Sequence, residues 1–293
     1  VSNIVPDHPV RIKVNPWVTK DGPGRFKRRA PLPDSASGLP EITLDSEWGY
    51  LVGVFQGDGG FTPSGIAVCG LEADRVVTEV AGILERIGLS PRVRRRNSRG
   101  LVEVRAHSVA FTHFLLRLGL GTRAPPRGAP SRQLEVPDFI FRSPRDVVLS
   151  YLAGMLDTDG TVSKNDISLS SKSDELLRGI KLLLEGLGIQ STIHSWWHRT
   201  FKRRYYVLSL GRHASREFIR IVPLRCTRKR LRAIQVMRAW GPGRPVATED
   251  IIVSVRADKK AEVFDLHVPD GHAYIAAGLV NHNCYEGQEE KLF

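Results

Sequence analysis

Leu152-Ala-Gly-Met-Leu-Asp-Thr-Asp159-Gly160 repeats the pattern of Leu51-Val-Gly-Val-Phe-Gln-Gly-Asp58-Gly59 after an interval of 101 residues. Each stretch is an apolar run with the character of a helix, and each ends in an acidic residue followed by glycine. The C-terminus of a helix carries a partial negative charge, so a carboxylate placed there is electrostatically unfavourable. We therefore expect a cation to offset the charges of Asp58 and Asp159.

Small residues recur four positions apart on one face of each predicted helix: Gly53 and Gly57 in the first, Gly154 and Thr158 in the second. Residues at this spacing share a face, and small ones allow two helix backbones to approach closely. If the helices pack through these faces, their acidic ends emerge together. Two carboxylates there suit Mg²⁺, which prefers hard oxygen ligands, water and phosphate and can promote phosphodiester hydrolysis. In the alternative interpretation, each Asp-Gly pair is only a turn after an amphipathic helix.

The segments around the two motifs also repeat. The first helix is predicted to begin near Asp45 or Ser46, both good N-cap residues, and to end at Gly59. After each motif we expect a strand, a helix, a pair of strands and a helix. These lie at 66–69, 74–87, 91–106 and 111–118 in the first copy, and at 167–169, 174–187, 192–210 and 215–222 in the second. The duplication favours two half-domains related by a pseudo-twofold axis, at about residues 45–122 and 145–240.

The amino-acid composition indicates what kind of partner the protein binds and in which compartment it is found. The net charge of +12 indicates a polyanionic partner. No apolar run is long enough to span a membrane, and the N-terminus lacks the pattern of a signal peptide. The three cysteines are an odd number and lie far apart, which is typical of a reducing compartment without a disulfide framework. We therefore expect a cytoplasmic protein that makes no membrane contact.

Basic residues lie within the predicted strand pairs of both copies. Alternation along a strand would place some of them on one face, where they can contact phosphates and guanine edges. The alternative is a charged face that is simply solvated. Because equivalent strands are basic in both copies, we favour a DNA-binding surface. Its predicted contacts are Arg92, Arg94, Arg96, Arg99 and Arg105 in the first copy, and Arg199, Lys202 and Arg204 in the second, beside Trp196 and Trp197.

Both motifs resemble the LAGLIDADG signature of homing endonucleases, and the resemblance spans roughly residues 48–240. It implies an α+β fold of two αββαββα halves, whose antiparallel sheets form a saddle over the DNA major groove. It also implies that Asp58 and Asp159 bind Mg²⁺ at the cleavage site, and that a basic residue, for which Lys229 is our candidate, lies near the scissile phosphate. The expected protein is a monomer that cuts double-stranded DNA at a long, pseudo-palindromic target. The first motif departs from the second by having Gln56 where the second has Asp157, which spares the metal-binding position.

The C-terminal region carries a different chemistry. In His282-Asn283-Cys284, the Asn283 side-chain amide can attack its own carbonyl and release the downstream segment as a succinimide forms. His282 and His272 can polarise that peptide or shuttle protons, since histidine titrates near neutral pH. Cys284 is a suitable acyl acceptor, because a thiolate is a strong nucleophile. The alternative is an Asn-Cys dipeptide without function.

This region resembles the C-terminal splicing motifs of an intein, with Asp265 and His272 at assisting positions. By the same resemblance, His8 activates the upstream splice junction, although Val5 replaces the usual threonine before it. We therefore expect the endonuclease to be inserted in a mostly β splicing domain of the Hint type. Residues 1–44 and 245–283 would form that domain, and 284–293 would begin the downstream extein. No Cys or Ser opens the chain, so splicing would need an N-terminal intein segment supplied in trans or removed earlier.

Two other functions stay open at this point. One is a DNA- or RNA-binding regulator or maturase that keeps the LAGLIDADG fold without cleavage. The other is a purely autoprocessing module whose central domain is inert.

Overall fold

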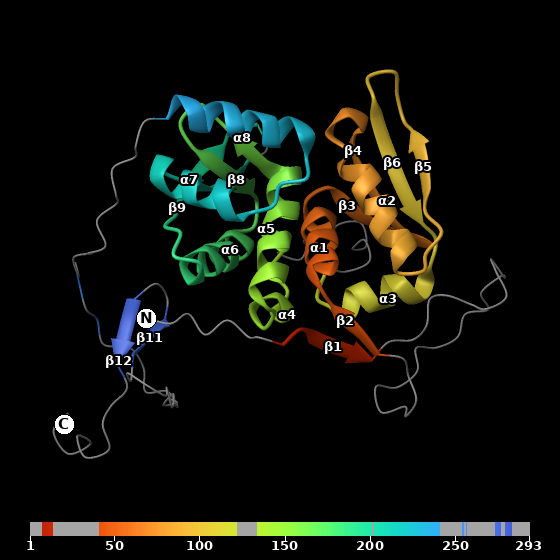
Figure 1. The fold of residues 1–293 in the computed structure, drawn as a ribbon, viewed down its shortest axis with the longest axis horizontal. Helices are drawn as coiled ribbons and strands as arrows, with labels where there is room; N and C mark the ends of the chain where they lie inside the picture. The colour runs from red at the N-terminus through yellow and green to blue at the C-terminus, as the bar shows by residue number, and fades with distance from the viewer. Residues whose placement is uncertain are drawn as a thin grey trace, which may run out of the picture.

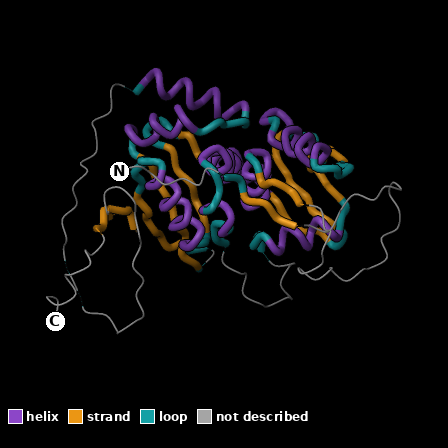
Figure 2. Tube along the Cα trace, turned by 60° about the horizontal axis from the view of Figure 1, so that its bottom comes forward, coloured by secondary structure: helices purple, strands orange, loops and turns teal. Residues whose placement is uncertain are grey.

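The computed structural model describes residues 8–13, 41–121, 134–200, 202–240, 254, 256, 273–276 and 279–282. The first half begins with helix α1, Ser46–Asp58, and the second with helix α5, Arg145–Asp159. These two helices lie side by side at the centre, with one sheet on either side (Figure 1), and the tilted view agrees (Figure 2). Together with the flanking helices, they form the core of the part of the chain that the structure describes.

The two halves repeat one order of elements. After α1 come β3 (Gly59–Thr62), β4 (Gly65–Leu71), the short helix η1 (Glu72–Asp74), α2 (Val76–Arg86), β5 (Arg92–Arg95), β6 (Leu101–Ala106) and α3 (Val109–Arg117). After α5 come β7 (Gly160–Val162), β8 (Ile167–Ser171), α6 (Asp174–Gly186), β9 (Thr192–His198), β10 (Arg203–Leu210) and α7 (Arg212–Ile221). The sheets are antiparallel with matching orders, β3-β4-β6-β5 and β7-β8-β10-β9. The predicted αββαββα order is therefore observed twice.

Local sequence explains where the helices begin. Asp45 caps α1 by accepting hydrogen bonds from the backbone N–H groups of Glu47 and Trp48. Ser108 and Ser173 cap α3 and α6 in the same manner. The N-terminus of α1 therefore lies where the sequence predicts it.

Among the described residues, helices pack against one face of each sheet. In the first half, β4 and β6 turn Ile66, Val68 and Val104 toward helices α2 and α3, and these residues are buried. In the second half, Ile167, Leu169 and Leu208 are buried on the corresponding side, toward α5 and α6. The period-two alternation of the strands places the remaining side chains on the opposite face of each sheet, called the open face below.

Contact between backbones explains the glycines of α1 and α5. A Cβ on Gly53 would lie 2.3 Å from the carbonyl oxygen of Tyr151, and one on Gly154 would lie 2.5 Å from that of Tyr50. One on Gly57 would lie 2.0 Å from Oγ1 of Thr158. The predicted pairing of the two small-residue faces is therefore observed.

Several elements were not predicted from the sequence. Helix α8, Thr227–Ala239, follows α7 and contacts η1 of the first half. Helix α4 is a single turn at Asp138–Phe141. Strand β2, Glu41–Leu44, pairs with β1, Val10–Lys13.

The C-terminal region is described only in part. Strands β11, Ala273–Ala276, and β12, Leu279–His282, form an antiparallel pair. The rest of residues 245–283, predicted as part of the splicing domain, lies outside the described residues except for Ser254 and Arg256. No helix in the described ranges is long and apolar enough to cross a membrane.

Candidate functional site

Asp58 and Asp159 are the last residues of α1 and α5, and both side chains are exposed where the helices end. Partial desolvation raises the pKa of both carboxyl groups, and the charge of Asp58 raises the pKa of Asp159 further. The positive charge of Lys229 opposes both shifts. The pairing of α1 with α5 therefore brings the two acids into one electrostatic site, as the repeated motif predicts.

Lys229 enters this site from helix α8. Its side chain is buried, and its Nζ donates hydrogen bonds of 2.7 Å to the carbonyl oxygens of Leu156 and Thr158. These carbonyls belong to the last turn of α5, where helix carbonyls lack partners within the helix. Burial lowers the pKa of Lys229, while the nearby charges of Asp157 and Asp58 raise it. The Lys229 ammonium group therefore binds the negative end of α5, close to the two exposed carboxylates.

The donor set suits a hard divalent cation with few protein ligands. Within the described ranges, no group of three or more His, Cys, Asp or Glu side chains is placed to hold a metal. Two exposed carboxylates leave most coordination positions to water and phosphate oxygens, which is the arrangement that Mg²⁺ commonly adopts.

A tyrosine of each helix donates a hydrogen bond to a side chain of the other helix that lies close in sequence to the exposed acid. The Tyr50 hydroxyl donates a 2.9 Å hydrogen bond to Oδ2 of Asp157, and the Tyr151 hydroxyl donates one of 2.7 Å to Oε1 of Gln56. Both tyrosines are fully buried. Burial is also the main reason that the pKa of each tyrosine is raised, so both stay protonated as donors. The two bonds repeat across the helix pair and fix its register.

The second partner of each motif explains why Gln56 and Asp157 differ. Oδ2 of Asp157 also accepts hydrogen bonds of 2.8 and 2.9 Å from the backbone N–H groups of Arg225 and Cys226. Gln56 instead donates its amide to the carbonyl oxygen of Glu135, at 2.8 Å. An ionised carboxylate accepts but does not donate, whereas an amide does both. The departure of the first motif is therefore a change of hydrogen-bond partner in the core and does not alter the exposed site.

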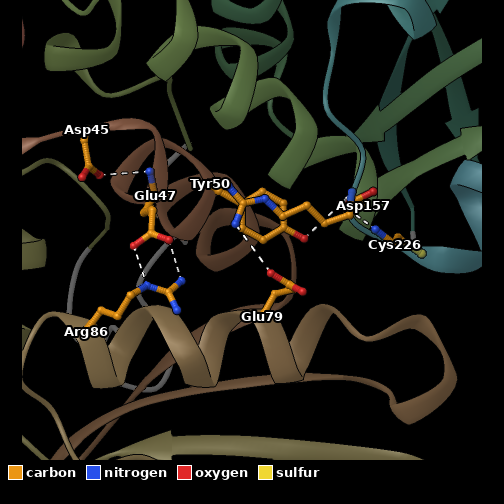
Figure 3. A network of polar contacts seen from close by, with 8 residues as sticks. Asp45, Glu47, Tyr50, Glu79, Arg86, Asp157 and Cys226 are labelled. Carbon is orange, nitrogen blue, oxygen red and sulfur yellow. Dashed lines mark hydrogen bonds and ion pairs between the residues drawn. The ribbon is translucent and has the colours of Figure 1, made fainter.

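The same network ties the second half to the first. The guanidinium of Arg225 lies 4.1 Å from the ring centre of Tyr50, and its NH1 is 3.7 Å from Oε2 of Glu79. Figure 3 shows the ring of Tyr50 above Glu79 and beside Asp157, with Cys226 on the far side of Asp157. From α8, Arg228 donates two hydrogen bonds of 3.1 and 3.0 Å to the carboxylate of Asp74 in η1.

The open face of the first sheet is rich in arginine. The register pairs Arg92 with Arg105 and Arg94 with Glu103, so these four residues share the face opposite α2. Arg92 and Arg94 are exposed and Arg105 is half-buried. Arg96 follows the strand and Arg99 lies in the turn between β5 and β6, and both are exposed. All five predicted arginine contacts are thus accessible.

The open face of the second sheet is mainly aromatic. Trp196 stacks on Tyr205 with ring centres 5.5 Å apart, and His198 lies 5.1 Å from Trp196. Arg199 and Lys202 are exposed in the turn between β9 and β10. Arg204 pairs with Trp197, on the face shared with the buried Leu208, so it lies away from this aromatic group.

The residues of the predicted splicing chemistry are described only in part. His8 is exposed just before β1, and His282 is the last residue of β12. Asp265, His272, Asn283 and Cys284 lie outside the described residues.

Three polar residues of the helix pair and of the first sheet were not predicted from the sequence to belong to the site. Tyr50 and Tyr151 stand directly before the two motifs at the same interval of 101 residues, so extending the repeat by one position would have found them. Glu103 carried no such signal, because its burial beneath arginines depends on the register of β5 and β6.

Comparison with known proteins identifies part of this fold. Residues 146–232 match the family described as LAGLIDADG-like domain, so the second half contains a LAGLIDADG-like domain.

In several similar proteins, the region that matches this chain is a small part of the total length. The chain is 22% identical over 205 residues to DNA-directed RNA polymerase subunit Rpo1C of Methanocaldococcus jannaschii, covering 68% of this chain and 20% of that protein. It is 24% identical over 298 residues to ribonucleoside-diphosphate reductase NrdEB subunit alpha of Bacillus subtilis, covering 87% and 26%. It is 31% identical over 144 residues to elongation factor 2 of Methanopyrus kandleri, covering 48% and 11%. The chain thus spans about a quarter or less of each relative.

Two solved structures are also similar. One is the homing endonuclease I-DmoI in complex with DNA and Mn, with 17% identity and a TM-score of 0.43, covering 60% of this chain and 96% of that chain. The other is full-length DUF199/WhiA from Thermatoga maritima, with 11% identity and a TM-score of 0.44, covering 70% and 64%.

Proposed function

We propose that residues 45–240 form a site-specific endonuclease that cleaves double-stranded DNA with Mg²⁺. The observation that carries this proposal is the placement of Asp58 and Asp159 at the ends of two helices whose backbones touch, with Lys229 beside them. The open arginine-rich and aromatic faces of the flanking sheets supply a surface for DNA. The net charge of +12 agrees with a polyanionic substrate.

In this mechanism, Asp58 and Asp159 would hold the metal between the two helix ends. When bound, such an ion activates water and stabilises the leaving oxygen in phosphodiester hydrolysis. Lys229 acts as a positioning residue, because its hydrogen bonds to Leu156 and Thr158 fix the end of α5 that presents Asp159. Its positive charge also favours the ionised form of both acids.

Replacing the acids tests cleavage separately from binding. Asp58→Asn and Asp159→Asn should each lower Mg²⁺-dependent cleavage of a randomised duplex pool at least about a hundredfold, since even outer-shell metal partners are worth 10–100-fold. Both variants should still bind DNA. Asp138→Asn is the matched control, because Asp138 is exposed on α4, away from the site. Full cleavage by a variant that carries both substitutions would refute the proposed metal site.

The alternative of a non-cutting DNA- or RNA-binding protein predicts a different outcome of this experiment. Such a protein would bind chosen sequences without nicking any duplex, in every Mg²⁺ concentration tested. The paired acids favour the nuclease, because a helix C-terminus disfavours a carboxylate that serves no ligand.

We also propose that the chain is part of a self-splicing insertion that carries this nuclease. The supporting observation is the identity of its relatives: a polymerase subunit, a reductase subunit and an elongation factor have unrelated activities, yet each matches over about a quarter of its length or less. A module inserted into different hosts accounts for this pattern. The His282-Asn283-Cys284 sequence supplies the groups for cleavage by cyclisation of asparagine.

Mass spectrometry of the purified chain tests the splicing chemistry. Incubation at neutral pH should release the peptide 284–293 and leave a succinimide at Asn283. Asn283→Ala should abolish the release, whereas Asn281→Ala, a change of the same kind two positions earlier, should not. Asp58→Asn should leave it unchanged. An intact chain after prolonged incubation would count against the splicing proposal without touching the nuclease.

A further inference from the structure

The open face of the first sheet contains a buried acid. Glu103 lies near the middle of β6 and is only 4% exposed, although the surrounding face is basic. A carboxylate on a DNA-facing surface repels phosphate and so lowers general affinity for DNA. Its place among the arginines therefore requires another explanation.

Glu103 fixes the geometry of two arginines. Its carboxylate accepts hydrogen bonds of 2.8 and 3.1 Å from Nε and NH2 of Arg105, and NH1 of Arg96 lies 3.5 Å from the same carboxylate. Arg94 lies opposite on β5 and adds a third positive charge. The bond from Arg105 is the largest cause of the lowered pKa of Glu103, which stays ionised. A paired, buried carboxylate of this kind holds its partners firmly.

The Arg105 guanidinium keeps N–H donors that can still bind a base. Of the five N–H donors of an arginine, the bonds to Glu103 use two and leave three. Arg105 is about one third exposed and Arg96 about one half, so their remaining donors reach solvent. Arginine donating two hydrogen bonds to O6 and N7 of guanine is the commonest specific contact in the major groove.

The second sheet offers no equivalent arrangement in its described residues. There the open face presents the Trp196–Tyr205 stack with His198 beside it. Aromatic side chains contact thymine methyl groups and sugars and cannot form the two-bond contact to guanine. The two halves therefore share a fold but differ in the chemistry of their open faces.

We propose that Glu103 is a specificity-determining positioning residue that holds Arg105 and Arg96 to read guanine in the half of the target covered by the first sheet. The proposal rests on the proposed function in one respect, which is that DNA is the partner. It follows that the target is chemically asymmetric, with guanine-dependent recognition by the first sheet on one side of its centre and contacts from a mainly aromatic sheet face on the other.

Selection of bound duplexes from a randomised pool, in Ca²⁺ so that no cleavage is needed, tests the proposal with the full chain. The wild type should enrich guanines on one side of the centre. Glu103→Gln should reduce that enrichment on the order of tenfold, the loss of about one two-bond contact. Glu72→Gln is the matched control, because it makes the same charge change and breaks the ion pair with Arg95 on the other face of β5.

The affinity for random DNA distinguishes a positioning role of Glu103 from a simple effect of its charge. Both Gln variants add one positive charge, so both should bind random DNA more tightly and with a steeper salt dependence. Only Glu103→Gln should lose guanine discrimination. Arg105→Lys should lose it as well with unchanged net charge, and it carries the test if thermal denaturation shows that Glu103→Gln does not fold. Trp196→Ala should alter preferences only on the opposite side of the centre.

Each outcome bears on a distinct claim. Guanine-free selected sequences, or equal enrichment by Glu103→Gln and wild type, would overturn the role of Glu103 and leave the nuclease intact. A pool that shows no sequence preference at all would overturn both. Guanine-dependent binding without any cleavage in Mg²⁺ would overturn the nuclease alone.

Discussion

Asp58 and Asp159 each occupy a position that costs stability in the absence of a ligand. Each carboxylate faces the negative end of its own helix, and the charge of Asp58 also acts on Asp159. Lys229 offsets these charges only in part, since the pKa of both acids remains raised. At the scale of single residues, the site therefore holds repulsion that a bound cation would relieve.

This repulsion predicts how stability depends on pH. A raised carboxyl pKa means that the folded protein binds more protons than the unfolded chain just above the ordinary value of Asp, so these two groups favour folding as the pH falls. In chelator at pH 7, the Asp58→Asn, Asp159→Asn double variant should be more stable than wild type by about 0.5–1 kcal/mol per carboxylate. At pH 4.5 the difference should shrink, and Mg²⁺ should stabilise only the wild type. Urea denaturation measures all three effects, and a difference that grows on acidification would contradict them.

At the scale of elements, the pair α1–α5 depends on backbone contact. A side chain at Gly53 would meet the carbonyl oxygen of Tyr151, which belongs to helix backbone and cannot rotate away. The helices would have to separate, and the two tyrosine hydrogen bonds would lengthen together. The relative position of Asp58 and Asp159 therefore depends on glycine at Gly53, as it does at Gly57 and Gly154.

Gly53→Ala should destabilise the protein by about 3 kcal/mol, the upper range of overpacking in a core. It should also reduce cleavage, because the two helix ends would move apart. Gly186→Ala is the matched control: Gly186 lies in helix α6, and no atom lies within 4 Å of an added Cβ. That variant should be neutral or slightly more stable, since alanine favours helix. Thermal denaturation of both variants checks the prediction, which fails if their melting temperatures agree.

The sequence predicted elements that are periodic or repeated, and failed where a long-range partner decides. Helices α2 and α6 have clear apolar faces, whereas α1 and α5 are buried around most of their circumference, and the repeat predicted how α1 meets α5. Helix α8 escaped because its buried side, formed by Lys229, Ala233 and Val236, includes a lysine and lacks an apolar stripe. That lysine is buried only because the last carbonyls of α5 accept its hydrogen bonds. Asp58 and Asp159 were predicted from their place in the motif, but the bond of Gln56 to Glu135 depends on a segment 79 residues away.

At the scale of the whole molecule, the two halves are joined at three levels. The backbones of α1 and α5 are in contact, and Tyr50 and Tyr151 each donate a hydrogen bond to the opposite helix. Helix α8 contacts the first half through the ion pair of Arg228 with Asp74. Unfolding of either half would expose the buried faces of α1 and α5. We therefore expect the halves to unfold in one cooperative transition.

Hydrogen exchange followed by mass spectrometry checks this expectation. Backbone amides in α2 and in α6, which lie in different halves, should exchange through openings of the same free energy, because neither half keeps its core alone. Gly53→Ala should lower that free energy equally in both helices. Protection that persists in α6 after α2 has exchanged would show that the halves unfold independently.

The unequal partners of Gln56 and Asp157 have a genetic consequence. A crossover between the two repeats of the gene, at the codons for Asp58 and Asp159, would join α1 directly to the second sheet. The product would lack Tyr151 and Glu135, the two partners that satisfy the Gln56 amide. The two repeats are therefore not interchangeable in this chain, because the hybrid protein would retain the buried Gln56 amide and lose both of its hydrogen-bond partners.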